Sequence, residues 1–233
     1  MKQKIIAVIP AYNEEKTVGD IVKRTKKYVD EVIVVNDCSK DNTEKVAKSA
    51  GALVLNHTVN KGLGASLRDG FETALKNGAD IIITLDADGQ HIPEDIPKFI
   101  DKINEGYDFV LGARDLSKYP LIKKIGNFFL NVATNFISGT NLKDTESGFR
   151  AFRRNALEKL QLKSDRYQIA VEIVFEVGRN NLKTANVPIK VPVYIKGVGV
   201  IDGIHNFAYL LHRRERRWRD YIADVKYVLK KWL

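Results

Sequence analysis

Short apolar runs alternate with longer amphipathic stretches along the first half of the chain. Apolar runs bounded by turn residues are typical of buried strands, whereas apolar positions three and four residues apart are typical of helices. We therefore expect strands near residues 4–9, 31–36, 52–56, 80–85 and 108–113. Helices are expected over residues 14–27, 42–49, 63–76 and 93–103. This alternation predicts an α/β fold, with a doubly wound, mostly parallel sheet flanked by helices.

The second half of the chain has a looser pattern. It predicts a helix over 121–138, a short strand over 148–152, a helix over 169–179, and strands over 184–188 and 191–195. No stretch rich in Pro, Gly or Ser separates the two halves. We expect one domain over residues 1–203, followed by a basic amphipathic helical tail over residues 204–233.

Polar side chains follow three of the predicted strands directly. Asp86 and Asp88 come after the apolar run 81–83, Asp37 comes after another β-branched run, and Tyr12 and Glu14 come after the first strand. Because the carboxyl ends of parallel strands share one edge of a sheet, these groups are expected to lie together, where open α/β sheets bind ligands. An Asp-x-Asp pair offers hard oxygen ligands to a divalent cation, although a solvated turn is also rich in Asp and Gly.

Five ordered motifs resemble those of the family 2 glycosyltransferases. They are the loop Pro10-Ala11-Tyr12-Asn13-Glu14, the acidic turn from Asp37 to Thr43, the pair Asp86-Ala87-Asp88, and the stretches Gly112-Ala113-Arg114 and Ser147-Gly148-Phe149-Arg150. The last two are similar to stretches of the polyprenyl-phosphate (dolichol-phosphate) mannose and glucose synthases. This resemblance covers roughly residues 4–195 and implies a fold of the GT-A type.

The resemblance implies a nucleoside diphosphate sugar as donor, of the GDP-mannose or UDP-glucose type. The residues that match the family's donor site are Pro10, Ala11, Tyr12, Glu14, Asp37, Asp86 and Arg114. Those that match its metal site, for Mg²⁺ or Mn²⁺, are Asp86, Asp88 and Gln90. An ion held there offsets charge on the leaving nucleotide, and an Arg fork suits bidentate phosphate binding.

The implied acceptor is a polyprenyl or dolichyl phosphate, and the implied reaction inverts the anomeric carbon. A phosphate with a second pKa of about 6 is largely ionised at neutral pH and needs no general base. The candidate catalytic residues are Asp88, Arg114, Asp144 and Arg150. Asp144 or Glu172 would instead serve as a base toward a hydroxyl acceptor of a glycan or glycolipid, which is the alternative reaction.

Charge and composition point to a peripheral location on the cytoplasmic face of a membrane. Cys38 is the single cysteine, no signal peptide begins the chain, and no stretch is long and apolar enough to span a bilayer. Residues 204–233 hold eight Lys and Arg against three Asp and Glu, a net +5 of the total +9. With interleaved Trp and Tyr, this tail suits an anionic membrane, although packing back on the domain would explain its apolar side equally well. Apolar residues on one side of the helix 121–138 are typical of core packing, and with a polyprenyl acceptor that side would instead lie at the membrane interface.

Many members of the family have C-terminal transmembrane helices, whereas others rely on a small membrane partner subunit. This chain resembles the second group, and we expect no nucleic-acid partner. Three other classes of protein compete with this interpretation. The stretch Gly62-Leu63-Gly64 resembles a dinucleotide fingerprint, but it lacks the third glycine and does not follow the first strand. A nucleotidyltransferase would need a Gly-rich basic first loop. A non-enzymatic membrane-binding module would leave the acidic strand ends unexplained.

Overall fold

The computed structural model describes residues 2–115, 121–191 and Tyr209. The described residues form a seven-stranded sheet in the order β3-β2-β1-β4-β6-β5-β7. Its strands are β1 (Ile5–Ala11), β2 (Glu31–Asn36), β3 (Leu53–Asn56), β4 (Ile81–Thr84), β5 (Phe109–Arg114), β6 (Arg150–Arg153) and β7 (Thr184–Ile189). All neighbours pair in parallel except β6, which runs antiparallel between β4 and β5. The α/β class and the mostly parallel sheet are confirmed.

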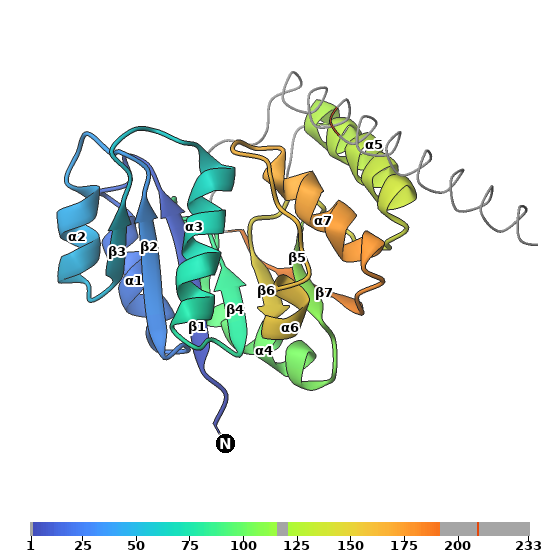
Figure 1. Cartoon of the computed structure of the whole chain (residues 1–233). Helices are drawn as coiled ribbons and strands as arrows, with labels where there is room; N and C mark the ends of the chain where they lie inside the picture. The colour runs from blue at the N-terminus through green and yellow to red at the C-terminus, as the bar shows by residue number, and fades with distance from the viewer. Residues whose placement is uncertain (1, 116–120, 192–208, 210–233) are drawn as a thin grey trace, which may run out of the picture.

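Helices cover both faces of the sheet (Figure 1). One face packs against α1 (Val18–Thr25), α2 (Thr43–Ser49) and α4 (Ile96–Asn104), which follows a 3₁₀ turn, η1 (Pro93–Asp95). The other packs against α3 (Leu63–Lys76), α6 (Arg154–Leu157) and α7 (Ile169–Arg179). Successive strand residues point to opposite faces, so Ala7 and Ile9 enter the first core while Ile6 and Val8 enter the second.

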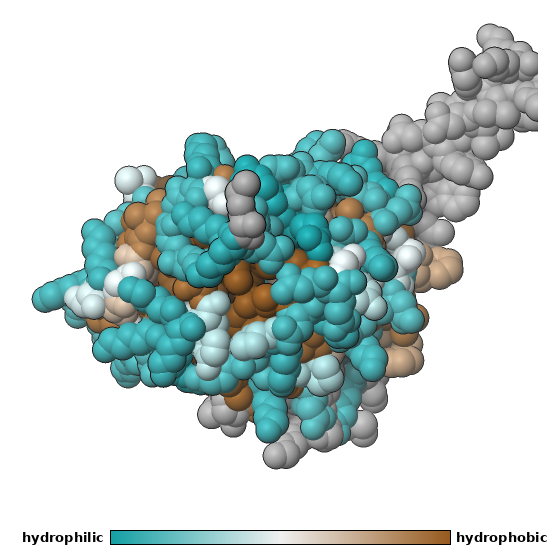
Figure 2. Space-filling view, turned by 90° about the horizontal axis from the view of Figure 1, so that it is seen from below, coloured by the Kyte–Doolittle hydropathy of each residue, from teal (hydrophilic) through white to brown (hydrophobic). Residues whose placement is uncertain are grey.

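Helix α5 (Leu121–Ser138) lies outside these two layers, against α7 (Figure 1). Its residue Ile137 is buried against Val171 and Phe175 of α7. The face of the molecule seen in Figure 2 is covered mainly by hydrophilic side chains, with apolar residues visible between them.

The structure differs from the sequence-based expectation at one helix boundary, at one strand and at one short helix. The expected helix 14–27 is α1, which begins only at Val18, because residues 14–17 form a turn. The expected strand 191–195 is wrong at Val191, which follows β7 without strand structure, and its other residues lie outside those described. The short helix α6 was not predicted. The tail 204–233 lies outside the described residues except Tyr209, so its helical form stays a prediction.

Candidate functional site

A cavity of about 900 Å³ opens at the carboxyl ends of β1, β2, β4 and β5. Its wall contains every residue that the sequence assigned to the site except Asp144 and the alternative base Glu172. These residues are Pro10, Ala11, Tyr12, Glu14, Asp37, Asp86, Asp88, Gln90, Arg114 and Arg150. Segments far apart in sequence meet here because parallel strands end at the same edge.

Asp86 is held at the cavity by its backbone and by its neighbours. Its N–H donates to Nδ1 of His91 (3.0 Å), a side chain that is 2 % exposed and packs near Phe149. Burial lowers the pKa of His91 against the opposing effect of nearby carboxylates, so the ring is neutral and its Nδ1 accepts. The carboxylate of Asp86 faces Gly148: a Cβ added there would lie 2.6 Å from Oδ1.

The carboxylate of Asp88 accepts two hydrogen bonds from Gln90. The backbone N–H of Gln90 donates to Oδ1 (2.9 Å), and its side-chain amide donates to Oδ2 (2.6 Å). Gln90 thus orients Asp88 in this structure, and its assignment as a metal ligand stays a prediction.

Glu14 adds a third carboxyl group to this side of the cavity. Its pKa is raised by burial first, and also by the negative charges of Asp88, Asp41 and Asp86, against a hydrogen bond from Thr17. Crowded carboxylates of this kind favour a bound cation. Among the described residues, no three His, Cys, Asp or Glu side chains form a ready metal cage. The carboxylates of Asp86 and Asp88 still fit Mg²⁺ or Mn²⁺. Such an ion usually takes one or two carboxylates and completes its coordination with water and substrate phosphates.

Arg114 and Asp144 form a bidentate pair. Nε and Nη2 of Arg114 donate to Oδ2 (2.6 Å) and Oδ1 (2.8 Å) of Asp144, and the Arg114 backbone N–H adds a longer bond (3.2 Å). The Asp144 side chain is 1 % exposed and lies behind the cavity wall. Both of its oxygens are therefore occupied in fixing the guanidinium, which favours an orienting role over that of a general base.

Arg150 is a buried cation in the wall, 2 % exposed, and its Nε has no hydrogen-bond partner. Burial lowers the pKa of this guanidinium to about 10, while Glu146, Asp86 and Asp144 act in the opposite direction. The group stays protonated at neutral pH. A buried charged donor with a free N–H is well suited to an anionic ligand, because an unsatisfied buried donor is costly.

Glu172, the other candidate base, lies outside the cavity wall. It is fully buried, and its carboxylate accepts from the backbone N–H groups of Lys163 (2.9 Å) and Ser164 (2.8 Å) and from the Tyr209 hydroxyl (2.8 Å). These bonds hold the loop that precedes α7, so Glu172 organises structure in this state.

Several wall residues were missed by the sequence analysis. They are Asn60, Gly62, Leu63, Ser66, Leu67, Thr84, Glu146, Arg166, Tyr167, Ile169 and Ala170. The loop before α7 reaches α3 because the Asp165 carbonyl accepts from the N–H groups of Gly64 (2.7 Å) and Ala65 (3.2 Å). No local signal in the sequence indicates this long-range contact.

No helix among the described residues has the length and apolar character needed to cross a membrane.

Comparison with known proteins assigns the fold and the family. The chain is 36% identical over 243 residues to the UDP-N-acetylglucosamine–dolichyl-phosphate N-acetylglucosaminyltransferase of Methanococcus voltae, covering 91% of this chain and 96% of that protein. It is 29% identical to the polyprenol monophosphomannose synthase of Mycolicibacterium smegmatis, covering 86% and 82%.

Glucosyl-3-phosphoglycerate synthase of Mycobacterium tuberculosis, solved with Mn²⁺, UDP-glucose and phosphoglyceric acid, has the same fold. The TM-score is 0.73 at 21% identity, over 91% of this chain and 80% of that one. The family model for glycosyl transferase family 2 matches residues 6–161. With the cavity at the strand ends and the acidic pair in its wall, this match means that the chain belongs to glycosyl transferase family 2.

Proposed function

We propose that this glycosyltransferase moves a hexose from a nucleoside diphosphate sugar to a polyprenyl or dolichyl phosphate, with inversion and with Mg²⁺ or Mn²⁺. The observation that carries the proposal is a cavity with two kinds of charge. Asp86 and Asp88 lie in its wall together with the buried cation Arg150 and with Arg114. An acidic pair suits a metal-bound diphosphate, and arginines suit a second anion. The two named relatives, which use lipid phosphates by their names, support this acceptor class.

The donor would bind at the β1, β2 and β4 side of the cavity. Asp86 and Asp88 would hold the metal ion, and Gln90 keeps Asp88 oriented. The ion, when bound, offsets negative charge on the departing nucleoside diphosphate. Tyr12, which is 45 % exposed, has the free ring surface needed to pack beside a nucleoside.

An acceptor phosphate is already an anion and can attack without a general base. The protein must then hold two anions close together, which requires cations. Arg150 offers a buried positive charge in the cavity wall, and Arg114 offers a guanidinium whose direction Asp144 fixes. In this scheme Asp144 acts through Arg114 and takes no proton.

Access to a lipid acceptor would come from peripheral binding to the cytoplasmic face of an anionic membrane, with a small membrane subunit as a further partner. Helix α5 supports this contact. Its side chains Phe128, Phe129, Val132 and Phe136 are 63, 66, 50 and 71 % exposed. Large apolar groups at these exposures mark an interaction surface. The basic tail 204–233 would add charge attraction.

The second candidate is transfer to a hydroxyl group of a glycan or glycolipid. The GT-A-like fold and the pair Asp86 and Asp88 suit both reactions equally. For a hydroxyl acceptor, Asp144 would have to leave Arg114 to act as the base. A non-enzymatic membrane-binding module is the third candidate, and it has no use for the paired carboxylates.

The test is a panel of labelled GDP-mannose, UDP-glucose and UDP-N-acetylglucosamine with polyprenyl phosphate and Mn²⁺. We expect one donor to give an organic-extractable, β-linked lipid phosphate sugar, and EDTA to abolish it. Label that enters a glycan but never the lipid phosphate would favour the hydroxyl acceptor. An α-linked product, or lipid labelling that survives EDTA, would overturn the inverting, metal-dependent mechanism.

A further inference from the structure

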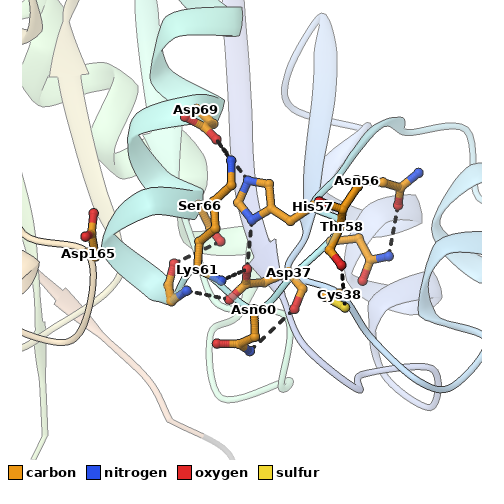
Figure 3. A network of polar contacts seen from close by, with 12 residues as sticks. Asp37, Cys38, Asn56, His57, Thr58, Asn60, Lys61, Ser66, Asp69 and Asp165 are labelled. Carbon is orange, nitrogen blue, oxygen red and sulfur yellow. Dashed lines mark hydrogen bonds and ion pairs between the residues drawn. The ribbon is translucent and has the colours of Figure 1, made fainter.

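His57 lies between the carboxylates of Asp37 and Asp69 (Figure 3). It is not among the residues that line the cavity. Its Nδ1 is 2.7 Å from Oδ1 of Asp37, and its Nε2 is 2.9 Å from Oδ2 of Asp69. Asp37 follows β2, His57 follows β3, and Asp69 belongs to α3, so the ring connects three elements. The His57 side chain is 5 % exposed.

Both contacts of this ring depend on its protons. An ionised carboxylate only accepts a hydrogen bond, so a ring nitrogen that bonds to one must carry a proton, and the ring can donate both bonds only when both of its nitrogens are protonated. Lys61, with Nζ 3.3 Å from Oδ2 of Asp69, is the other cation of the cluster. Burial acts to raise the pKa of Asp37 and of Asp69, but hydrogen bonds from His57 and from Lys61 hold both below their usual value. With both nitrogens of His57 protonated, the cluster contains two negative and two positive charges.

This cluster also fixes the chain that forms the cavity wall. The backbone N–H groups of Lys61 and Gly62 donate to Oδ1 and Oδ2 of Asp37, both at 2.8 Å. Gly62, with φ of +97°, is the N-cap residue directly before α3. Asp37, Asn60 and Gly62 line the cavity, whereas His57 and Asp69 stand behind them. Asp37 thus connects the ring of His57 to a segment that lines the cavity.

We propose that His57 is a positioning residue for nucleotide binding: as a cation between Asp37 and Asp69 it fixes the turn at 60–62 and offsets carboxylate charge beside a cavity that takes an anion. The inference rests on the proposed function, because it assigns the β2 and α3 side of the cavity to the nucleoside diphosphate. Three of about four acceptor positions of Asp37 are used by the protein, which leaves Oδ2 able to accept one bond from the nucleoside.

Two other roles for His57 are less consistent with the contacts. A general acid or base must reach the substrate, and both ring nitrogens face carboxylates behind the wall. A metal ligand must present a bare nitrogen, and this imidazolium has none.

The test measures binding of UDP and GDP, each with Mn²⁺, by calorimetry to the full chain and four variants. His57→Gln removes the cation, Asp69→Asn removes one carboxylate, and the double variant removes both. Lys76→Gln is the matched control, because it removes one positive charge from the exposed end of α3. Thermal unfolding checks that each variant is folded.

We expect His57→Gln to weaken binding of the preferred nucleotide by about tenfold or more, and Lys76→Gln to change it by less than about twofold. The double variant should recover part of the loss, because a single remaining carboxylate repels the anion less. With saturating donor, kcat of His57→Gln should stay within about threefold of the wild type, while KM for the donor rises.

If the wild type binds the nucleotide and His57→Gln binds it equally well, the positioning role alone is overturned. Absence of UDP and GDP binding by the wild type would overturn the proposed function itself. If His57→Gln does not fold, nitrogen NMR of the wild type decides: two protonated ring nitrogens on His57 at neutral pH support the inference, and one bare nitrogen overturns it.

Discussion

The backbone of Gly148 lies against the carboxylate of Asp86. A Cβ at position 148 would be 2.6 Å from Oδ1 and 2.8 Å from Oδ2 of that side chain. The carbonyl of Gly148 also accepts from the Thr84 hydroxyl (2.7 Å), which fixes the approach of the two segments. Glycine is therefore the residue that lets Asp86 occupy its place in the cavity wall.

Gly148→Ala should displace Asp86 and reduce transfer by about a hundredfold, because a shift of about 1 Å in a charged group of the site is enough for such a loss. The fold should lose only about 1–3 kcal/mol of unfolding free energy. Steady-state kinetics and urea unfolding measure both. Gly126→Ala is the control, since nothing lies within 4 Å of a Cβ there. Equal activity of the two variants would mean that Asp86 can move without consequence.

Asp88→Asn should lower turnover by about a hundredfold or more, because loss of one carboxylate weakens the hold on the ion that stabilises the leaving group. The Asn side chain keeps its size, so the unfolding midpoint should hardly change. Turnover is measured over a range of Mn²⁺ concentrations. Asp101→Asn, on the exposed side of α4, is the control. Normal turnover of Asp88→Asn at limiting Mn²⁺ would remove Asp88 from the metal site.

Arg114→Lys should lower transfer by about tenfold or more, because lysine keeps the charge but cannot form the two parallel bonds to Asp144. Arg24→Lys is a matched control: Arg24 forms a similar bidentate pair with Glu94 (3.0 and 2.6 Å) on the surface. Kinetics with saturating donor separate the two variants. If both behave like the wild type, the direction of the Arg114 guanidinium does not matter for the reaction.

Asp37 should stabilise the fold in a pH-dependent manner. Hydrogen bonds from His57, Lys61 and Gly62 outweigh burial and lower its folded-state pKa below the unfolded value of 3.8. A carboxyl group with a lowered pKa stabilises the protein fully above the unfolded value, and this contribution is lost as pH falls through the folded value. The wild type should therefore exceed Asp37→Asn in unfolding free energy at neutral pH, and the difference should shrink below 3.8. Urea unfolding across this range measures it, and a constant difference would contradict the prediction.

Replacing Phe128, Phe129 and Phe136 by Ser should release the protein from liposomes without loss of nucleotide binding. These side chains are more than 60 % exposed, so their removal costs little in the core. Sedimentation with anionic liposomes measures the effect.

Replacing Arg213, Arg214, Arg216 and Arg217 by Gln tests the tail separately. The charge attraction of the tail to the membrane should weaken with added salt, because charges are screened over roughly a Debye length of 10 Å at 0.1 M. Unchanged sedimentation of both variants would favour a partner subunit as the anchor.

Much of the fold follows from local pattern. The strands β1, β2 and β4 are continuous apolar runs, as expected of strands buried on both faces. The helix 121–138 was also predicted, but its apolar side divides in the structure: Ile137 packs on α7, while Phe128 is exposed. Periodicity identifies a face of a helix, and it does not identify what covers that face.

The sequence by itself determined that Tyr12, Asp37 and Asp86 would meet, because parallel strands bring their carboxyl ends to one edge whatever lies between them. Only the tertiary structure decided that β6 enters antiparallel between β4 and β5 and pairs Arg150 with Thr84. A strand of four residues has too short a pattern to specify its partner or register, so its place depends on the packing of the whole sheet. The contacts of Gly148 with Asp86, and of His57 with Asp37 and Asp69, follow from that packing.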